Sequence, residues 1–223
     1  MSLDDQGFTI IDNVVSTAAC DELIEKIDNL GSASAGSRRL LDHVWCRQIG
    51  NQIQSTLVDR LVVINQLIPV QCTYFHKTPT SNWLVTWHQD RSIPVAAQLD
   101  SPGLTGWSTK EGLIFVHGTD EILSQMIAVR LHLDDSTSTN GPLRVVQGSH
   151  RSGTLSENEI EPMRRERGES TCIVPKGGVL AMRPLILHAS SKSKSEEPRR
   201  VLHFLFGPQR LSHGLSWACI GST

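Results

Sequence analysis

An imidazole and a carboxylate stand close together in the segment TWHQD, where only one residue separates His88 from Asp90. In an extended chain, side chains at positions i and i+2 point to the same face, so these two groups converge. They can bind a metal if a third ligand comes from another part of the chain. The pair alone is weak evidence, because an ordinary hydrogen-bonded pair at a strand end has the same sequence.

A third ligand is available in the run LILHAS, which contains His188. Two histidines and one carboxylate on one side of a metal form the facial triad of non-haem Fe(II) oxygenases. This arrangement leaves the opposite side of the metal open for a bidentate 2-oxo acid and O2. Arg199 begins the next strand-like run and can clamp a carboxylate through two parallel hydrogen bonds. The triad and the clamp together predict a 2-oxoglutarate site.

The segments around these residues predict a mainly β fold. From about Leu67, short apolar and β-branched runs are separated by Pro, Gly, Ser, Asn and Asp, without helical segments between them. This pattern indicates an antiparallel sandwich or jelly roll. Helical periodicity comes earlier, first after a Ser16 N-cap and then in a second segment, with apolar positions at Cys20, Leu23, Ile24, Ile27 and Leu30, and at Ile49, Ile53, Leu57 and Leu61.

The length of 223 residues favours a single domain over 1–223. We expect a mainly helical layer at 1–66 and a jelly-roll core at 67–210, with the helices packed on the barrel. The composition of 31–39 predicts a flexible loop, and the polar run 156–170 predicts an exposed insertion. Five scattered cysteines without a C-x-x-C pair are interpreted as small apolar residues.

Charge and composition point to a small-molecule substrate. The net charge is -2, with no basic run that would favour nucleic acid and no footprint for a membrane surface. The acidic start MSLDDQGF does not resemble a signal peptide, and no apolar run reaches membrane-spanning length. We therefore expect a soluble, cytoplasmic protein. The sequence does not predict its oligomeric state.

The run MIAVRLHLDD predicts a strand with two different faces. Ile127, Val129, Leu131 and Leu133 share one parity and are expected to pack against the N-terminal helices. Arg130 then faces the barrel interior, where an unpaired guanidinium is destabilising. Two partners remain open for it: a carboxylate of the protein and an anionic group of the substrate. This makes Arg130 a hypothetical substrate contact.

Four segments resemble the phytanoyl-CoA dioxygenase family of Fe(II)/2-oxoglutarate oxygenases and together extend over nearly the whole chain. They are QGFTIIDNVVSTAACDELIEKI, YFHKTPTSNWLVTWHQD, LHLDDSTSTNGPLRVVQGSH and PKGGVLAMRPLILHASSKSKSEEPRRVLHF. The resemblance implies a double-stranded β-helix, which is a cupin-like jelly roll. It also implies a dioxygenase that converts 2-oxoglutarate and O2 to succinate and CO2 while oxidising an unactivated C–H bond. Hydroxylation is the default outcome, and the sequence does not decide between it and desaturation, cyclisation or epimerisation.

The resemblance also implies roles for individual residues. His88, Asp90 and His188 would hold Fe(II), and Arg199 would bind the C5 carboxylate of 2-oxoglutarate. The family spacing selects Arg199 over its neighbour Arg200. By position, the resemblance also implies Ser190 and Lys77 as cosubstrate contacts and Gln71 as a contact to cosubstrate or substrate. Phe75 departs from the family pattern, and Phe75 and Trp87 are hypothetical substrate contacts that the resemblance does not supply.

Two other functions stay open at this point. A zinc hydrolase could use the same three ligands, but it would need a general base and has no use for Arg199. A non-catalytic jelly roll could bind a small organic acid as a sensor. The other histidines are interpreted as surface or hydrogen-bonded core residues: His43, His76, His117, His132, His150, His203 and His213.

Overall fold

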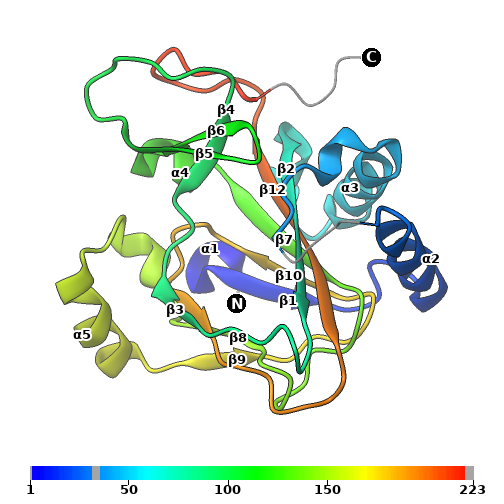
Figure 1. The fold of residues 1–223 in the computed structure, drawn as a ribbon. Coiled ribbons are helices and arrows are strands. Elements are labelled where there is room, and N and C mark those ends of the chain that lie inside the picture. The colour runs from blue at the N-terminus through cyan, green and yellow to red at the C-terminus, as the bar shows by residue number, and fades with distance from the viewer. Residues whose placement is uncertain (1, 32–35, 219–223) are drawn as a thin grey trace.

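The chain folds into two facing antiparallel sheets with helices on the outside of one of them (Figure 1). This computed structural model describes residues 2–31 and 36–218. The larger sheet has the order β1-β10-β7-β12-β2. Its strands are β1 (Phe8–Ile11), β10 (Val179–Met182), β7 (Ile127–His132), β12 (Arg199–Pro208) and β2 (Leu67–Lys77).

The second sheet completes the barrel and carries the ends of the metal-site strands. Its order is β3 (Val85–His88), β11 (His188–Ser190), β8 (Leu143–Val145) and β9 (Ser170–Cys172). A third sheet follows the metal-site segment and is formed by β4 (Ser92–Val95), β6 (Leu113–His117) and β5 (Thr105–Lys110). All pairings within the three sheets are antiparallel.

Five α-helices accompany the sheets in the described ranges. They are α1 (Leu3–Gln6), α2 (Thr17–Asp28), α3 (Val44–Leu57), α4 (Asp120–Ser124) and α5 (Glu157–Arg167), with 3-10 turns at Leu40–Asp42, Val62–Gln66 and Ser149–Ser152. The predicted Ser16 cap of α2 is confirmed, because its side chain accepts a hydrogen bond from the Ala19 backbone N–H. The helices α2 and α3 cover the outer face of the larger sheet (Figure 1).

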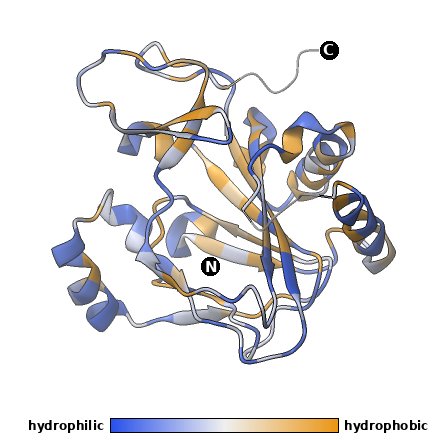
Figure 2. Ribbon diagram, in the orientation of Figure 1, coloured by the Kyte–Doolittle hydropathy of each residue, from blue (hydrophilic) through white to orange (hydrophobic). Residues whose placement is uncertain are grey.

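The two predicted faces of β7 are confirmed. Ile127, Val129 and Leu131 belong to the buried cluster that also contains helical residues such as Leu23 and Ile53. Ala128 and Arg130 have the opposite parity and lie on the inner side, between the sheets. In Figure 2 the inner strands β7 and β10 of the larger sheet are largely hydrophobic, as expected for a layer with helices on one side and a sheet on the other.

The structure also departs from the sequence predictions in places. The segment 1–66, expected to be mainly helical, also supplies β1, which is an edge strand of the larger sheet. The helix α3 ends at Leu57, and Leu61 is buried but lies before a 3-10 turn. The insertion at 156–170 is exposed as predicted, yet most of it forms the polar helix α5 (Figure 2). A Ser156/Glu159 capping box begins that helix.

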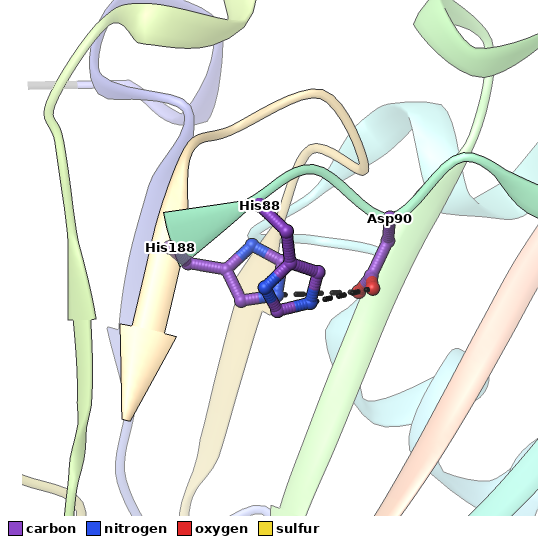
Figure 3. A group of neighbouring side chains, drawn as sticks. All are labelled: His88, Asp90 and His188. Carbon is purple, nitrogen blue, oxygen red and sulfur yellow. Dashed lines mark ion pairs between the residues drawn. The ribbon is translucent and has the colours of Figure 1, made fainter. Parts of the chain in front are cut away.

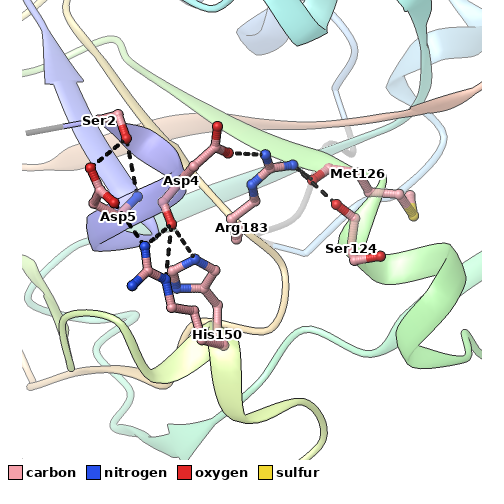
Figure 4. A network of polar contacts seen from close by, with 8 residues as sticks. Ser2, Asp4, Asp5, Ser124, Met126, His150 and Arg183 are labelled. Carbon is pink, nitrogen blue, oxygen red and sulfur yellow. Dashed lines mark hydrogen bonds and ion pairs between the residues drawn. The ribbon is translucent and has the colours of Figure 1, made fainter.

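The N-terminal turn is tied to one end of the barrel by polar contacts (Figure 4). The backbone carbonyl of Asp4 accepts hydrogen bonds from His150 Nε2 at 3.2 Å and from Arg151 Nη2 at 3.0 Å. The Asp4 carboxylate forms an ion pair with Arg183, which precedes the second metal-site strand. His150 therefore has a structural role, as its sequence context indicated.

Two further predictions can be compared with the described residues. Cys20, Cys46, Cys72 and Cys172 are free and buried, as expected for small apolar side chains. Cys219 and positions 32–35 of the predicted loop lie outside the described residues. None of the described helices has both the length and the apolar character needed to cross a bilayer.

Candidate metal centre and cosubstrate pocket

Strand pairing brings the two histidines of the triad together. His88 ends β3 and is directly opposite His188, the first residue of β11, in the antiparallel register. Their ring centroids are 4.2 Å apart, and Asp90 follows in the turn after β3 (Figure 3). The Asp90 backbone N–H donates to the Pro184 carbonyl at 3.0 Å, which holds this turn against the segment that leads into β11.

The three side chains converge in a geometry that fits a metal ion. The Nε2 atoms of His88 and His188 each lie 3.6 Å from an oxygen of Asp90. One ligand atom from each of the three residues lies within 4.8 Å of the other two. Among the described residues, this is the one group of three or more His, Cys, Asp or Glu side chains that converges in this way. Two imidazole nitrogens and one carboxylate oxygen are the donor set expected for Fe(II).

Backbone carbonyls select the imidazole nitrogens that face the site. His88 Nδ1 lies 2.8 Å from the Thr86 carbonyl oxygen, and His188 Nδ1 lies 2.9 Å from that of Ile186. A carbonyl can only accept, so Nδ1 carries the proton in each ring and Nε2 presents its lone pair to the shared centre.

The charges of Asp90 and His188 also suit a metal. Burial alone would raise the pKa of the Asp90 carboxyl, but the imidazoles of His188, His88 and His203 hold it well below its usual range. Burial lowers the pKa of His188 to about 4, so this ring is neutral near pH 7. An ionised carboxylate and a neutral imidazole are the protonation states that bind a metal.

The segment between the ligands is fixed by a side chain that the sequence analysis did not select. Gln89 Nε2 donates to the carbonyls of Gly153 and Leu185 at 2.8 and 2.7 Å, and its Oε1 accepts from the Leu155 N–H at 2.8 Å. These three bonds connect the H-x-D segment to two other parts of the chain. In an extended chain, the residue between two ligands that share one face points to the opposite face. This alternation is the sequence signal that could have identified Gln89.

The triad opens onto a cavity between the sheets, with a volume of about 290 Å³. The side chains of His88 and Asp90 are 38% and 32% exposed, whereas that of His188 is only 3% exposed. His188 thus supports the site from within the barrel, while the other two ligands face the open side. Most of the predicted site residues line this cavity: His88, Asp90, His188, Arg199, Ser190, Gln71, Lys77, Arg130 and Phe75.

Arg199 faces the cavity and has an unused donor. It is buried, its Nε donates to the Asn140 carbonyl at 3.2 Å, and its buried Nη1 has no hydrogen-bond partner within the described residues. Arg200 points to the other side, where it forms a two-pronged ion pair with Asp134 at 2.8 Å for each contact. The strand register therefore gives only Arg199 access to a ligand in the barrel.

Lys77 and Ser190 lie beside Arg199. Lys77 is directly opposite Arg199 in the pairing of β2 with β12. Its Nζ donates to Ser190 Oγ at 2.9 Å and to the Ser191 carbonyl at 2.6 Å. Gln71 is further along β2, where its amide donates to Thr73 Oγ1 at 2.8 Å. An unpaired guanidinium, an ammonium and a hydroxyl at one end of the cavity suit the carboxylate of a 2-oxo diacid.

The prediction that Trp87 contacts the substrate is wrong for this structure. Trp87 does not line the cavity and instead packs with Val146 and Leu187 on the other side of β3. The guanidinium groups of Arg144 and Arg164 lie 5.1 and 4.6 Å from the ring centroid. The physical reason is strand parity: Trp87 is the neighbour of His88, so the two side chains point to opposite faces.

His203 is a cavity residue that the sequence analysis assigned to the surface or core. Its Nε2 lies 3.8 Å from Asp90 Oδ2, and its Nδ1 lies 2.9 Å from Arg130 Nη1. Because Arg130 can only donate, His203 Nδ1 accepts, and the proton of the neutral ring is on the Nε2 that faces Asp90. Positions 199, 201 and 203 of one strand share a face, so parity counted from Arg199 could have identified this histidine.

Arg130 has no carboxylate partner in the part of the chain that the structure describes. Its guanidinium lies 5.1 Å from the Phe75 ring centroid, and its buried Nε has no hydrogen-bond partner. Two acidic side chains that could have neutralised it are engaged elsewhere, because Asp134 pairs with Arg200 and Glu111 pairs with Arg38. Arg130 is thus a buried cation directed at the cavity.

Lys77 is expected to make the stability of the metal-free protein rise with pH. Burial and the charges of Arg199 and Arg130 lower the pKa of its ammonium group from the usual 10.5 to about 7. Between a pH of about 7 and a pH of 10.5, Lys77 is still protonated in the unfolded chain but has lost its proton in the folded protein. The free energy of unfolding therefore increases with pH, by at most about 1.4 kcal/mol per pH unit for one proton.

Urea denaturation of wild type and Lys77→Met across this pH window measures the effect. The wild type should gain stability relative to Lys77→Met as the pH rises. The exposed Lys194→Met serves as a control and should follow the wild type. Parallel stability curves for wild type and Lys77→Met would show that Lys77 keeps its ordinary pKa.

Comparisons with known proteins identify the family and the fold of the chain. A family model described as phytanoyl-CoA dioxygenase (PhyH) matches residues 3–201. The solved structure of EctD from S. alaskensis with bound Fe is similar at a TM-score of 0.70 and 15% identity, over 97% of this chain and 77% of that chain. No curated protein sequence matches.

Two other solved structures share the fold. HygX from Streptomyces hygroscopicus, with nickel and 2-oxoglutarate bound, has a TM-score of 0.62 and 20% identity, over 92% of this chain and 84% of that chain. The non-heme alpha-ketoglutarate-dependent carbocyclase SnoK from nogalamycin biosynthesis has a TM-score of 0.67 and 13% identity, over 97% and 83%. These likenesses confirm the predicted jelly-roll fold with N-terminal helices.

Proposed function

Because the chain belongs to the phytanoyl-CoA dioxygenase family of Fe(II)- and 2-oxoglutarate-dependent oxygenases, we propose that it hydroxylates a small-molecule substrate at an unactivated C–H bond. When bound, the iron supplies the chemistry that splits O2, converting 2-oxoglutarate to succinate and CO2 and leaving one oxygen atom for the substrate. The observation that carries the proposal is the convergence of His88, Asp90 and His188 at the cavity.

The proposed task of the triad is to hold Fe(II) from one side. His88 and His188 offer Nε2 lone pairs whose direction is set by backbone carbonyls, and Asp90 offers an ionised carboxylate. With all three ligands on one side, the cavity side stays available for cosubstrate and O2. The cavity lies between the two sheets and is open on the side of His88 and Asp90, so the sheets would limit the access of water only to its inner part.

The proposed cosubstrate contacts lie at the Arg199 end of the cavity. The unpaired Nη1 of Arg199 would donate to the C5 carboxylate of 2-oxoglutarate, with Lys77 and Ser190 beside it. Gln71 lies further along β2 and is proposed as an additional contact to cosubstrate or substrate. This arrangement would orient the 2-oxo acid along the barrel, with its other end at the metal.

Succinate formation tests the proposal directly. The purified protein, supplied with Fe(II), 2-oxoglutarate and O2, should release succinate and CO2, and the release should stop under nitrogen. Substrate candidates are then scored by the increase in succinate above this background. A zinc hydrolase or a non-catalytic sensor would form no succinate under any of these conditions, and that result would reject the oxygenase proposal.

Arg130 and Phe75 are proposed substrate contacts. Arg130→Leu should remove substrate-dependent succinate formation, because the leucine cannot pair with an anionic group of the substrate. The dissociation constants for Fe(II) and 2-oxoglutarate should change little. Both constants can be measured by calorimetry under nitrogen, alongside oxygen consumption in air. If Arg130→Leu unfolds or loses iron, the arginine supports the barrel through His203 and is not a substrate contact.

A further inference from the structure

Three imidazoles surround the Asp90 carboxylate, and two of them belong to the triad. The Nε2 atoms of His88 and His188 each lie 3.6 Å from one of its oxygens, and the Nε2 of His203 lies 3.8 Å from Oδ2. No other basic side chain in the described ranges comes within 4.0 Å of this carboxylate. The third ring is thus a neighbour of a proposed metal ligand, although it is not part of the group that fits a metal.

The three rings do not present the same group to the carboxylate. The Nδ1 atoms of His88 and His188 donate to backbone carbonyls, so their Nε2 atoms carry lone pairs. The Nδ1 of His203 instead accepts from Arg130 Nη1 at 2.9 Å, so the proton of this ring is on Nε2. Of the three rings, His203 is therefore the one that directs an N–H group at Asp90.

The orientation of the His203 ring is fixed by its neighbours. His203 on β12 is directly opposite Arg130 on β7, and both side chains lie on the inner face of the larger sheet. The Phe75 ring meets the imidazole in a T-shaped contact, with the ring centroids 5.8 Å apart, and it also packs against the Arg130 guanidinium. The His203 side chain is only 10% exposed. A ring packed in this way has little room to flip and exchange its two nitrogens.

The carboxylate of Asp90 needs such a partner more than its main chain does. The Asp90 backbone N–H is bonded to the Pro184 carbonyl, and the Gln89 side chain makes three further bonds. These bonds fix the main chain of the H-x-D segment, whereas the carboxylate can still turn about its own side-chain bonds. An aspartate in a facial triad offers one oxygen to the metal, and its orientation depends on hydrogen bonds from groups that do not touch the metal.

We propose that His203 is a positioning residue for the metal centre: its Nε2–H donates to one oxygen of Asp90, which directs the other oxygen at the metal. This inference rests on the proposed function of the triad, because it concerns one of the same ligands. The separation of 3.8 Å is longer than a hydrogen bond. The proposal requires this gap to close to about 2.9 Å when Asp90 binds the metal.

Nitrogen-15 NMR of the Zn(II)-loaded protein tests the position of the proton. Zn(II) is diamagnetic and accepts the same imidazole and carboxylate ligands as Fe(II). The shifts of a neutral imidazole show which ring nitrogen carries the proton, and the His203 signals are those that disappear in His203→Gln. His203 should be protonated on Nε2. A proton on Nδ1 would overturn the inference, because Nε2 could then only accept.

Two amide variants separate the two nitrogens of the ring. The side-chain nitrogen of glutamine reaches roughly the position of Nε2, whereas that of asparagine reaches only the position of Nδ1. His203→Gln therefore keeps a donor for Asp90, and His203→Asn loses it. The dissociation constant for Co(II), measured by calorimetry, should rise by roughly 10–100-fold in His203→Asn and stay within about threefold of wild type in His203→Gln.

The visible absorption spectrum of the Co(II) protein distinguishes positioning from general support of the fold. Its bands depend on the number and arrangement of the ligand atoms, so they should change in His203→Asn and resemble wild type in His203→Gln. His76→Asn is the matched control, because His76 is opposite Arg200 in the strand register and does not line the cavity. Its Co(II) affinity and spectrum should equal those of wild type. Thermal melting of each protein checks that it is folded.

Two results with the variants would overturn the inference. One is an unchanged Co(II) affinity and spectrum in His203→Asn. The other is a loss of the same size in both amide variants, which would mean that the histidine only fills space. If His203→Asn does not fold, the NMR measurement on the wild type still decides, because it needs no asparagine variant.

A failure of the oxygenase proposal gives a different result. That proposal fails alone if the wild type binds Co(II), the two amide variants differ as expected, and the Fe(II) protein forms no succinate from 2-oxoglutarate. The inference about His203 fails alone if succinate is formed while both amide variants bind Co(II) like wild type. A wild-type protein that binds neither Co(II) nor Fe(II) would overturn both.

Discussion

Alanine in place of His88, Asp90 or His188 is expected to remove Fe(II) binding and 2-oxoglutarate turnover. Each variant loses one of three converging ligand atoms. Loss of a residue that only supports a ligand already lowers metal affinity by roughly 10–100-fold, and loss of a ligand itself should exceed that. Calorimetry with Fe(II) under nitrogen measures the affinity, and succinate formation measures the turnover.

The fold should survive these substitutions. His88 and Asp90 are partly exposed to the cavity, so truncating them removes little packing within the core. The control is His213→Ala, which removes an imidazole that faces Glu121 and does not line the cavity. Wild-type iron affinity in all three triad variants would show that the metal binds elsewhere.

Arg199→Ala is expected to weaken 2-oxoglutarate binding far more than Fe(II) binding. The substitution removes the unpaired guanidinium and leaves the cosubstrate carboxylate without its two-pronged donor. By comparison with other buried charge pairs, the loss is about 2–5 kcal/mol, which is at least about thirtyfold in the dissociation constant. Titration of 2-oxoglutarate into the Ni(II)-loaded protein measures this change.

Arg200→Ala is the matched control for this prediction. It removes a neighbouring guanidinium that pairs with Asp134 on the outer side. It should lower stability modestly and leave cosubstrate affinity unchanged. Arg199→Lys should recover only part of the affinity, because an ammonium cannot form the parallel pair of bonds. The assignment is reversed if the dissociation constant rises in Arg200→Ala and stays constant in Arg199→Ala.

Several features could be predicted from local sequence because they depend on short-range geometry. The alternation of side chains along a strand placed His88 and Asp90 on one face, and it separated the two faces of the Arg130 strand. Short β-rich runs separated by turn residues were enough to predict the jelly roll. The Ser16 cap followed from residue type alone, because a hydroxyl can satisfy a free N–H of the first helical turn.

The alternation of side chains along a strand also accounts for the positions of Trp87 and His203. The same alternation that selected His88 would have placed Trp87 on the opposite side of β3. Counted from Arg199, it would also have brought His203 to the cavity. Helix α5 was not predicted because its sequence is mostly polar. Its Ile160 and Met163 pack against a small buried cluster, and its capping box and ion pairs such as Arg164–Glu161 also support it.

Other features required the tertiary structure, because they depend on which partners meet across long sequence separations. The sequence contains enough acidic residues to neutralise every cation, with 23 Asp and Glu against 21 Lys and Arg. Only the fold assigns Asp134 to Arg200 and Glu111 to Arg38, and it leaves Arg91, Lys110 and Arg130 without an ion pair to any residue that the structure describes. Residue types and strand periodicity could thus predict the metal ligands, whereas the pairing of distant charges is settled only when the sheets close around the site.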